Sequence, residues 1–350
     1  MSATIPACHV GIMGTSLSGM DAAMAVAIQH GEFQESDDAI AFTLDNGHEA
    51  LNIVLMSRSG ILPEADFYCP IPYEPLNVVT KSAVDDVIAA GADGLLDRVF
   101  KLMVKELKEA APEWSTSIEL NTLHADSFPE AWFAYRHKQN PFHWANANLN
   151  EVERNKRDRC TVPWRYTILR LHEVIEDIFP YLDESDAKRF SDGLAKVFID
   201  NYAAIPSQSI RRLLALHKAG IISILALGED YTLHRQQPKT LIETKGKNLA
   251  FDVFIDARGQ KALKTKDLPF PRLRQQIQNS GDEIPEVGDD YTLLSPESAR
   301  GRIALGALPY LMHDQPFVQG LTVCAEIGAA IANTLVESSL RPRKRLAYLA

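Results

Sequence analysis

The opening segment of the chain alternates between apolar runs and a stretch with helical spacing. An apolar run over residues 9–13 ends at Gly14, and residues 17–30 then carry many Ala and Met residues at helical spacing. An acidic stretch over 32–49 contains a turn signal, and a second apolar run covers 51–56. These patterns predict a βαβ unit with a tight turn after its first strand and the acidic stretch as an inserted excursion.

The middle of the chain has the spacing of amphipathic helices. Residues 63–75 are rich in proline and predict a loop, whereas residues 81–111 place apolar side chains on one helical stripe. Such a stripe indicates packing against a core rather than a cofactor pocket. Further helices are expected over 168–178, 186–202 and 207–219. Residues 81–219 are therefore predicted to form a large, mainly helical insertion.

Short strand-like runs return after Gly220. They cover residues 221–227, 231–235, 240–244 and 251–256. Near the end of the sequence, the pattern predicts a strand at 302–305 and a helix of small residues at 321–335. Together with the opening βαβ unit, these runs predict an α/β fold in which a Rossmann-like dinucleotide-binding sheet is interrupted by the helical insertion.

The turn after the first predicted strand has the spacing of a dinucleotide-binding loop. The sequence GTSLSG from Gly14 to Gly19 matches G-x-G-x-x-G except that Ser16 replaces the middle glycine. Gly14 permits the tight turn, the amides at the helix start face a diphosphate, and Gly19 lets helix and strand approach closely. The cofactor contacts predicted here are Gly14, Thr15, Ser16, Leu17, Ser18 and Gly19. The alternative is a glycine-rich turn that binds no ligand.

The end of the second predicted strand indicates which nicotinamide cofactor is bound. An acidic residue at this position binds the ribose 2′-hydroxyl of NAD, whereas an arginine accommodates the 2′-phosphate of NADP. Here the strand ends in Ser57, Arg58 and Ser59, and an arginine can form a forked, charge-assisted contact to a phosphate. Ser57 and Arg58 are therefore predicted to select NADP(H). The alternative is that Arg58 is an ordinary surface residue.

Charge and cysteine usage narrow the class of protein. The 350-residue chain has a formal net charge of -10, which argues against a broad contact with nucleic acid, because phosphate backbones bind clusters of Lys and Arg. No apolar stretch approaches the roughly 20 residues of a membrane helix, and the start lacks a basic region followed by a hydrophobic one. The four cysteines are widely spread, as free thiols of a reducing compartment are. We expect a cytoplasmic protein without a nucleic-acid or membrane partner.

Other candidate chemistry is less specific. The nucleophile elbow of a hydrolase, G-x-S-x-G, also lies between strand and helix, but this sequence fails that pattern at Ser18, so a hydrolase is a minor alternative. His137 and His143 lie in the polar, aromatic segment 136–144, which predicts a loop, and their spacing is not that of a zinc site. For these histidines, substrate contact is the alternative to a plain loop role. No metal site and no catalytic residue is assigned.

Several segments resemble one family of flavoproteins. Residues 14–22, GTSLSGMDA, resemble the pyridine-nucleotide motif of the uncharacterised NAD(P)/FAD-binding oxidoreductases, relatives of the flavin-containing monooxygenases. Segments 205–207, 219–222 and 251–260 resemble that family in the same order, the last at the crossover back to a flavin-binding domain. Residues 317–322, FVQGLT, resemble the start of the family's final flavin-facing helix. The resemblance implies cofactor contacts at Asp21, Gln319, Gly320, Leu321 and Thr322.

The resemblance also implies a function. In such enzymes NADPH passes a hydride to FAD, which then reduces an unknown acceptor or activates oxygen, and the cofactors carry the chemistry. These flavoproteins begin with a separate FAD motif, whereas here only residues 9–13 precede the nucleotide motif, and Gly306-Ala307 stands where relatives often carry Gly-Asp. We therefore expect a partner chain or a second copy to supply the FAD-binding segment. The alternative is a non-catalytic nucleotide-binding or interaction protein from a truncated or split gene.

The expected fold class is thus α/β, a Rossmann-like sheet with a large helical insertion and a remnant of a flavin-binding domain. The expected domains are 1–80 as the NADP(H)-binding half, 81–219 as the insertion, 220–265 as the strands that complete the nucleotide-binding domain, and 266–350 as the flavin-domain remnant.

Overall fold

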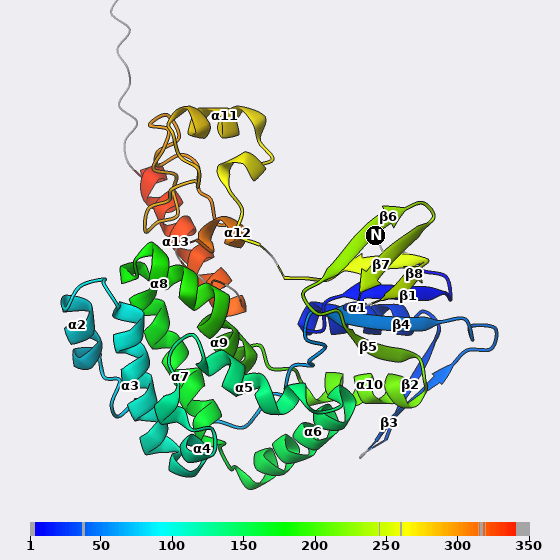
Figure 1. Ribbon diagram of the computed structural model, residues 1–350. Coiled ribbons are helices and arrows are strands. Elements are labelled where there is room, and N and C mark those ends of the chain that lie inside the picture. The colour runs from blue at the N-terminus through cyan, green and yellow to red at the C-terminus, as the bar shows by residue number, and fades with distance from the viewer. Residues whose placement is uncertain are drawn as a thin grey trace, which may run out of the picture. The chain divides into compact units, whose positions relative to one another are not determined.

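The structure is a computed structural model of the chain (Figure 1). It describes residues 4–36, 39–244, 246–259, 261–313, 315, 318 and 320–340. The chain divides into two compact units, Met1–Gly259 and Gln260–Ala350.

The first unit contains a parallel sheet of four strands (Figure 1). The strands are β1 (His9–Met13), β4 (Asn52–Ser57), β5 (Ile222–Ala226) and β9 (Val253–Asp256), in the spatial order β5-β4-β1-β9. β1 pairs with β4 and with β9, so that Ile12 is in register with both neighbouring strands. The α/β class predicted from the sequence is confirmed in this form, as a mixed fold with a parallel sheet.

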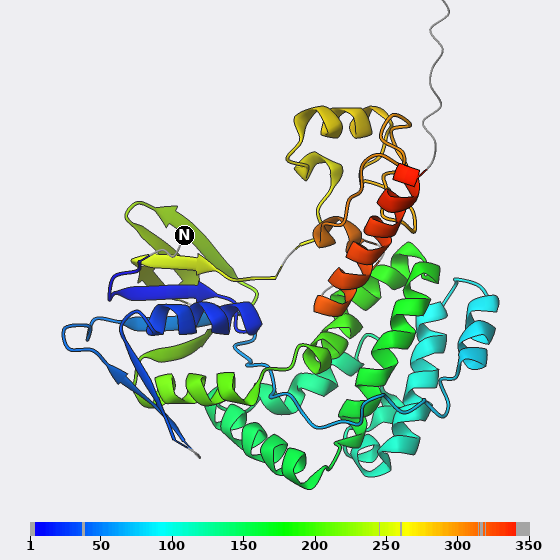
Figure 2. The same cartoon turned by 180° about the vertical axis from the view of Figure 1, so that it is seen from behind.

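Helices cover one face of this sheet. The helices α1 (Leu17–Ala27) and α10 (Ser207–Lys218) pack there (Figure 2). Met20 and Leu213 of these helices join Ile12 in one buried core. Residues of β1 alternate between the two faces of the sheet, as a strand requires, so Val10 and Ile12 face the helices while Gly11 and Met13 face the other side.

An antiparallel sheet covers the other face. Its strands are β6 (Tyr231–Gln236), β7 (Lys239–Thr244) and β8 (Lys247–Phe251). Phe251 packs flat over β1, because a Cβ placed on Gly11 would lie only 2.7 Å from its ring. The strand-like runs after Gly220 therefore contribute to two sheets, which the run pattern alone does not reveal.

The acidic stretch after α1 is a β-hairpin. The strands β2 (Gly31–Glu35) and β3 (Ile40–Leu44) pair in antiparallel register, with the rings of Phe33 and Phe42 in edge contact at 4.9 Å. The pattern of polar residues predicts only an excursion here, so neither strand was expected.

Helices fill the segment between β4 and β5. They are α2 (Lys81–Ala89), α3 (Leu95–Ala110), α4 (Pro112–Ser117), α5 (Phe128–His137), α6 (Pro141–Asp158), α7 (Pro163–Ile178), α8 (Glu184–Arg189), α9 (Ala195–Tyr202) and α10. Short 3-10 turns at Leu120–Thr122 and Phe179–Tyr181 and a π-helical turn at Phe190–Leu194 connect some of them. Helical structure is thus confirmed where the sequence predicts it over 168–178, 186–202 and 207–219.

Two details of this helical part differ from the sequence-based expectation. The predicted helix over 81–111 is broken at Gly91 and Gly94, whose φ angles of 96° and 64° are readily adopted by glycine. The segment 136–144 is not a loop, because α5 runs to His137 and α6 begins at Pro141. Asn140 caps α6 by accepting hydrogen bonds from the amides of Phe142 and His143.

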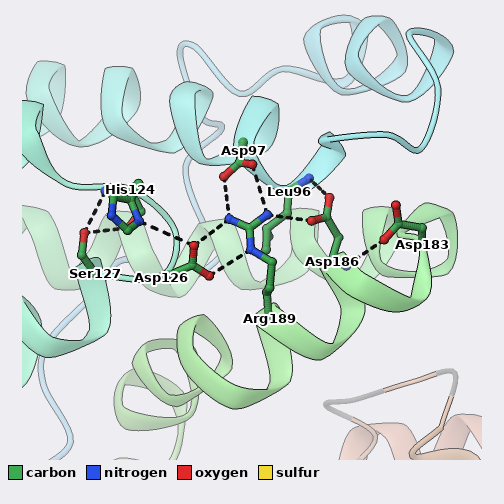
Figure 3. A network of polar contacts seen from close by, with 8 residues as sticks. All are labelled: Leu96, Asp97, His124, Asp126, Ser127, Asp183, Asp186 and Arg189. Atoms are coloured by element: carbon green, nitrogen blue, oxygen red, sulfur yellow. Dashed lines mark hydrogen bonds and ion pairs between the residues drawn. The ribbon is translucent and has the colours of Figure 1, made fainter.

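One arginine forms ion pairs that connect three helical segments (Figure 3). Arg189 of α8 binds the carboxylates of Asp97 in α3 and Asp126 before α5, with its Nη2 at 2.9 and 2.7 Å, and its Nη1 lies 2.7 Å from Asp186. Asp186 in turn accepts a hydrogen bond from the amide of Leu96, at the start of α3. Hydrogen bonds from Arg189 lower the pKa of Asp97 and of Asp126, so both carboxylates stay charged well below neutral pH.

The second unit holds α11 (Pro271–Asn279), α12 (Leu308–Leu311) and α13 (Leu321–Leu340). The helix predicted over 321–335 is confirmed. The strand predicted at 302–305 is wrong, because this segment contributes only an isolated bridge from Ala304 to Thr292. Among the residues described in either unit, no helix is both long and apolar enough to cross a membrane.

Candidate functional site

A cleft of about 590 Å³ opens beside the turn that follows β1. One wall comes from this turn and from the segment after β4, with Thr15, Ser16 and Arg58 among the lining residues. The other wall comes from helices α5 and α9, which contribute His137 and Lys196. The structure thus brings three of the predicted cofactor contacts to one cleft in the first unit.

The two glycines of the motif are required by backbone packing. Gly14 has a φ of 133°, and a Cβ at this position would lie 2.8 Å from the carbonyl oxygen of Ala257, just after β9. A Cβ on Gly19 would lie 2.3 Å from the carbonyl oxygen of Gly14. The turn after β1, the first turn of α1 and the end of β9 therefore approach one another more closely than any side chain permits.

Ser16 is the N-cap residue of α1. Its backbone is extended, its side chain makes no capping hydrogen bond, and it is exposed at the cleft. The first amides of a helix have no partner within the helix, and here the first amide to bond back is that of Met20, which donates to the carbonyl of Ser16 at 2.9 Å. The start of α1 therefore presents backbone donors and one hydroxyl beside the cleft, together with the positive end of the helix dipole.

Hydrogen bonds of Thr15 and Ser57 connect the turn after β1 with the segment after β4. The Thr15 hydroxyl lies 2.8 Å from the carbonyl oxygen of Ile61 and 3.1 Å from the Ser57 hydroxyl. Ser57 also accepts a hydrogen bond from the amide of Gly60 at 2.9 Å. These hydrogen bonds fix the shape of the two turns that carry Ser16 and Arg58.

Arg58 lies at the edge of the cleft. Its side chain is 63% exposed, and its Nη1 lies 3.5 Å from a carboxylate oxygen of Glu229, whose side chain is 78% exposed. An ion pair this exposed contributes about 1 kcal/mol or less. The guanidinium is therefore available to a stronger anion that enters the cleft.

The end of β9 brings a charged pair near the turn. Arg258 donates through Nε and Nη2 to the two oxygens of Asp256, at 2.8 and 2.7 Å. These hydrogen bonds lower the pKa of the Asp256 carboxyl and raise that of Arg258. The pair is internally neutralised, so it adds little net charge next to Gly14.

The side chains of the remaining predicted contacts that the structure describes do not line the cleft. Leu17, Ser18 and Asp21 are exposed on α1, and Gly19 is buried at its start. Gly320, Leu321 and Thr322 belong to the second unit, where Gly320 has a φ of 92° and precedes α13, and Leu321 is 91% exposed. Gln319 lies outside the described residues.

The helical wall of the cleft was only partly predicted from the sequence. His137, for which substrate contact was one of two interpretations, lines the cleft from α5, whereas Lys196 of α9 was not predicted. Both helices are distant from the glycine motif in the sequence, so no local pattern connects them with it. His143 lies in the first turn of α6 and is exposed, and it does not line this cleft. Within the part of the chain that the structure describes, no group of three or more His, Cys, Asp or Glu side chains is arranged to hold a metal ion.

Two comparisons with known proteins give matches. Residues 80–202, which hold α2 to α9, match a family model described as a YdhS-like middle domain. The chain is also 64% identical over 349 residues to a protein of Escherichia coli (strain K12) named "Uncharacterized protein YdhS". The match covers 99% of this chain but 65% of that relative, so the chain spans about two thirds of its length. Neither name states an activity, and the oxidoreductase function inferred from the sequence stays a prediction.

Proposed function

We propose that the parallel sheet is a Rossmann-like dinucleotide-binding sheet and that the cleft beside β1 binds NADP(H). Counted along the chain, the four parallel strands lie in the spatial order 3-2-1-4, which is the order found in Rossmann folds. In such sheets the ligand lies outside the carboxyl end of the first strand, where the strand order reverses. That position corresponds to the turn at Gly14, between β1 and β9.

The observation that carries the proposal is the close backbone packing at Gly14 and Gly19. In the dinucleotide motif the first glycine allows the tight turn and the last allows close packing of helix on strand, and a Cβ at either position would overlap a carbonyl oxygen here. The diphosphate would lie against the amides of residues 17–19 and the Ser16 hydroxyl, at the positive end of α1. Ser16 needs no glycine-like backbone, since its φ is -97°.

The adenosine end of the cofactor would lie along the end of β4. Arg58 and Ser59 both line the cleft, and Lys196 lines its opposite wall. A 2′-phosphate carries the charge that these side chains can bind, whereas the 2′-hydroxyl of NAD does not. We therefore propose a preference for NADP(H), with Arg58 exchanging the exposed Glu229 carboxylate for the phosphate.

The proposed reaction is that of a flavin-dependent oxidoreductase. NADPH would supply a hydride to FAD, which reduces an acceptor that the sequence does not identify. In this proposal the chain binds and orients the dinucleotide and shields it from water between the β1 turn and α5. The FAD part rests on the resemblance of residues 317–322 and on the exposed start of α13 at Leu321. A partner chain or second copy for FAD binding, and a cytoplasmic location, belong to the same proposal.

The test is the cofactor preference of an Arg58→Ala variant. We expect NADPH to bind about ten- to a hundredfold more weakly than to the unaltered protein, because one charge-assisted phosphate contact is lost. NADH binding should change little. Arg157→Ala is the matched control, because Arg157 is an exposed arginine of α6 that pairs with Asp158 and does not line the cleft. Equal losses for both cofactors would refute the phosphate role of Arg58.

A further inference from the structure

A second pocket lies inside the helical part of the first unit. It has a volume of about 370 Å³, and all four tryptophans of the chain line it. The rings of Trp114 and Trp164 stack at 5.6 Å with an interplanar angle of 1°, and Trp132 meets Trp114 edge-on at 5.8 Å. This lining suits a flat, apolar ring, because aromatic side chains pack on such ligands over a large area.

A buried network of charges adjoins these rings. Arg165 and Arg136 both contact the Glu64 carboxylate, with Nη1 to oxygen distances of 2.9 and 3.6 Å, and Arg136 also binds Asp200 at 2.6 Å. The four side chains are only 5 to 11% exposed. Trp132 donates to Asp200 at 2.9 Å. Two positive and two negative charges therefore balance within the protein and hold the arginines in fixed positions.

One edge of Arg165 has no protein partner. Its Nη1 binds Glu64 and its guanidinium lies over the ring of Phe67 at 4.3 Å, yet its Nε and Nη2 are buried and make no hydrogen bond to any described residue. The indole Nε1 of Trp144, on the same pocket, is buried and unpaired in the same way. Buried donors without acceptors are costly, and each such group calls for an explanation.

The same edge of other arginines in this chain binds carboxylates. Arg189 donates from Nε and Nη2 to the two oxygens of Asp126, at 3.0 and 2.7 Å (Figure 3), and Arg258 does the same to Asp256. These two donors are parallel and match the two oxygens of a carboxylate. Arg165 also stands in the first turn of α7, where the helix dipole favours a negative group.

We propose that this pocket binds a small monocarboxylate attached to a flat ring. The carboxylate accepts from Nε and Nη2 of Arg165, and the ring packs among the tryptophans with Trp144 Nε1 as a further donor. Glu151, which is half-buried in the pocket wall, disfavours a second negative charge on the ligand. The pocket shares none of the proposed dinucleotide contacts, so this proposal does not depend on whether the chain binds NADP(H).

Intrinsic fluorescence tests the proposal directly, because every tryptophan of the chain lines the pocket. The probe is 3-phenylpropanoate, and the matched neutral compound is 3-phenylpropanamide, which keeps the ring and the chain length. We expect the acid to change the emission saturably and to bind at least about tenfold more tightly than the amide, with calorimetry confirming the two affinities. No binding of the acid, or equal binding of acid and amide, would overturn the proposal.

Two variants locate the contact. Arg165→Lys keeps the charge next to Glu64 but removes the fork, and should weaken binding of the acid about tenfold or more. Trp144→Phe keeps a ring and removes the buried donor, and should weaken it by a smaller factor. Arg159→Lys, at an exposed position after α6, is the control and should bind normally. If a folded Arg165→Lys protein binds the acid as tightly as the unaltered protein does, Arg165 does not bind the carboxylate. If that variant does not fold, the relative affinities of the unaltered protein for the acid and the amide test the proposal.

Discussion

Replacing Ser16 by aspartate should separate nucleotide binding from folding. Ser16 is the N-cap of α1, it is exposed at the cleft, and its side chain makes no capping hydrogen bond. Aspartate is as good an N-cap as serine, and its charge interacts favourably with the positive helix end. The Ser16→Asp protein should therefore melt at the same temperature as the unaltered protein or slightly higher.

The same charge should oppose a diphosphate at the start of α1. Two unit charges about 5 Å apart repel by about 1 to 3 kcal/mol at effective dielectric constants of roughly 80 to 20. We therefore expect NADPH to bind about four- to two-hundredfold more weakly. Ser16→Asn provides the matched control, since asparagine caps a helix equally well without a charge, and it should bind NADPH within a few-fold of the unaltered protein.

The assay is isothermal titration calorimetry with NADPH, together with thermal denaturation of all three proteins. Addition of salt should reduce the difference between the two variants, because it screens the repulsion at this exposed site. Should Ser16→Asp bind NADPH as tightly as Ser16→Asn, no diphosphate lies at the start of α1, and our placement of the ligand is wrong.

Two further predictions concern stability. Burial lowers the pKa of His172 to about 4, so the unfolded chain takes up a proton as the pH falls from about 6.5 towards 4 while the folded protein does not. The unfolding free energy should therefore drop by about 1 to 2 kcal/mol between pH 7 and 5, allowing for partial solvent screening. Urea titrations at the two pH values should show a smaller drop for the His172→Gln variant. If the variant loses as much stability as the unaltered protein, groups other than His172 cause the effect. Arg189→Gln leaves the carboxylate of Asp186, whose side chain is 5% exposed, without its cation. Urea denaturation should show a loss of about 2 to 4 kcal/mol in unfolding free energy. Lys188→Gln removes only an exposed ion pair and should lower it by about 0.5 kcal/mol or less. Equal costs would show that the network in Figure 3 is not stabilising.

The elements that depend on local pattern could be predicted from the sequence. The apolar runs at 9–13 and 51–56 form strands, and the helix begins at Leu17 as predicted, although it ends at Ala27 rather than at residue 30. Short continuous apolar runs are typical of strands that are buried on both faces, and the helix has apolar residues at helical spacing. The segment 136–144 was misassigned because Asn140-Pro141 reads as a loop signal, although the same two residues also cap and begin a helix.

The site could be predicted only on the side formed by local sequence. Gly14, Ser16 and Arg58 belong to two turns that follow neighbouring parallel strands, so the motif brings them together. The opposite wall and the second pocket depend on how distant helices pack. The pairing of Arg165 with Glu64 across the fold leaves no periodic signal in a single sequence.

The decisive measurement is a calorimetric titration of the unaltered protein with NADPH. If the turn after β1 binds NADP(H), binding is saturable and one-to-one, 2′,5′-ADP displaces the cofactor, and NADH binds more weakly. A calorimetric titration that shows no heat of binding for either dinucleotide, over the range in which the protein stays folded, would contradict NADP(H) binding at this turn.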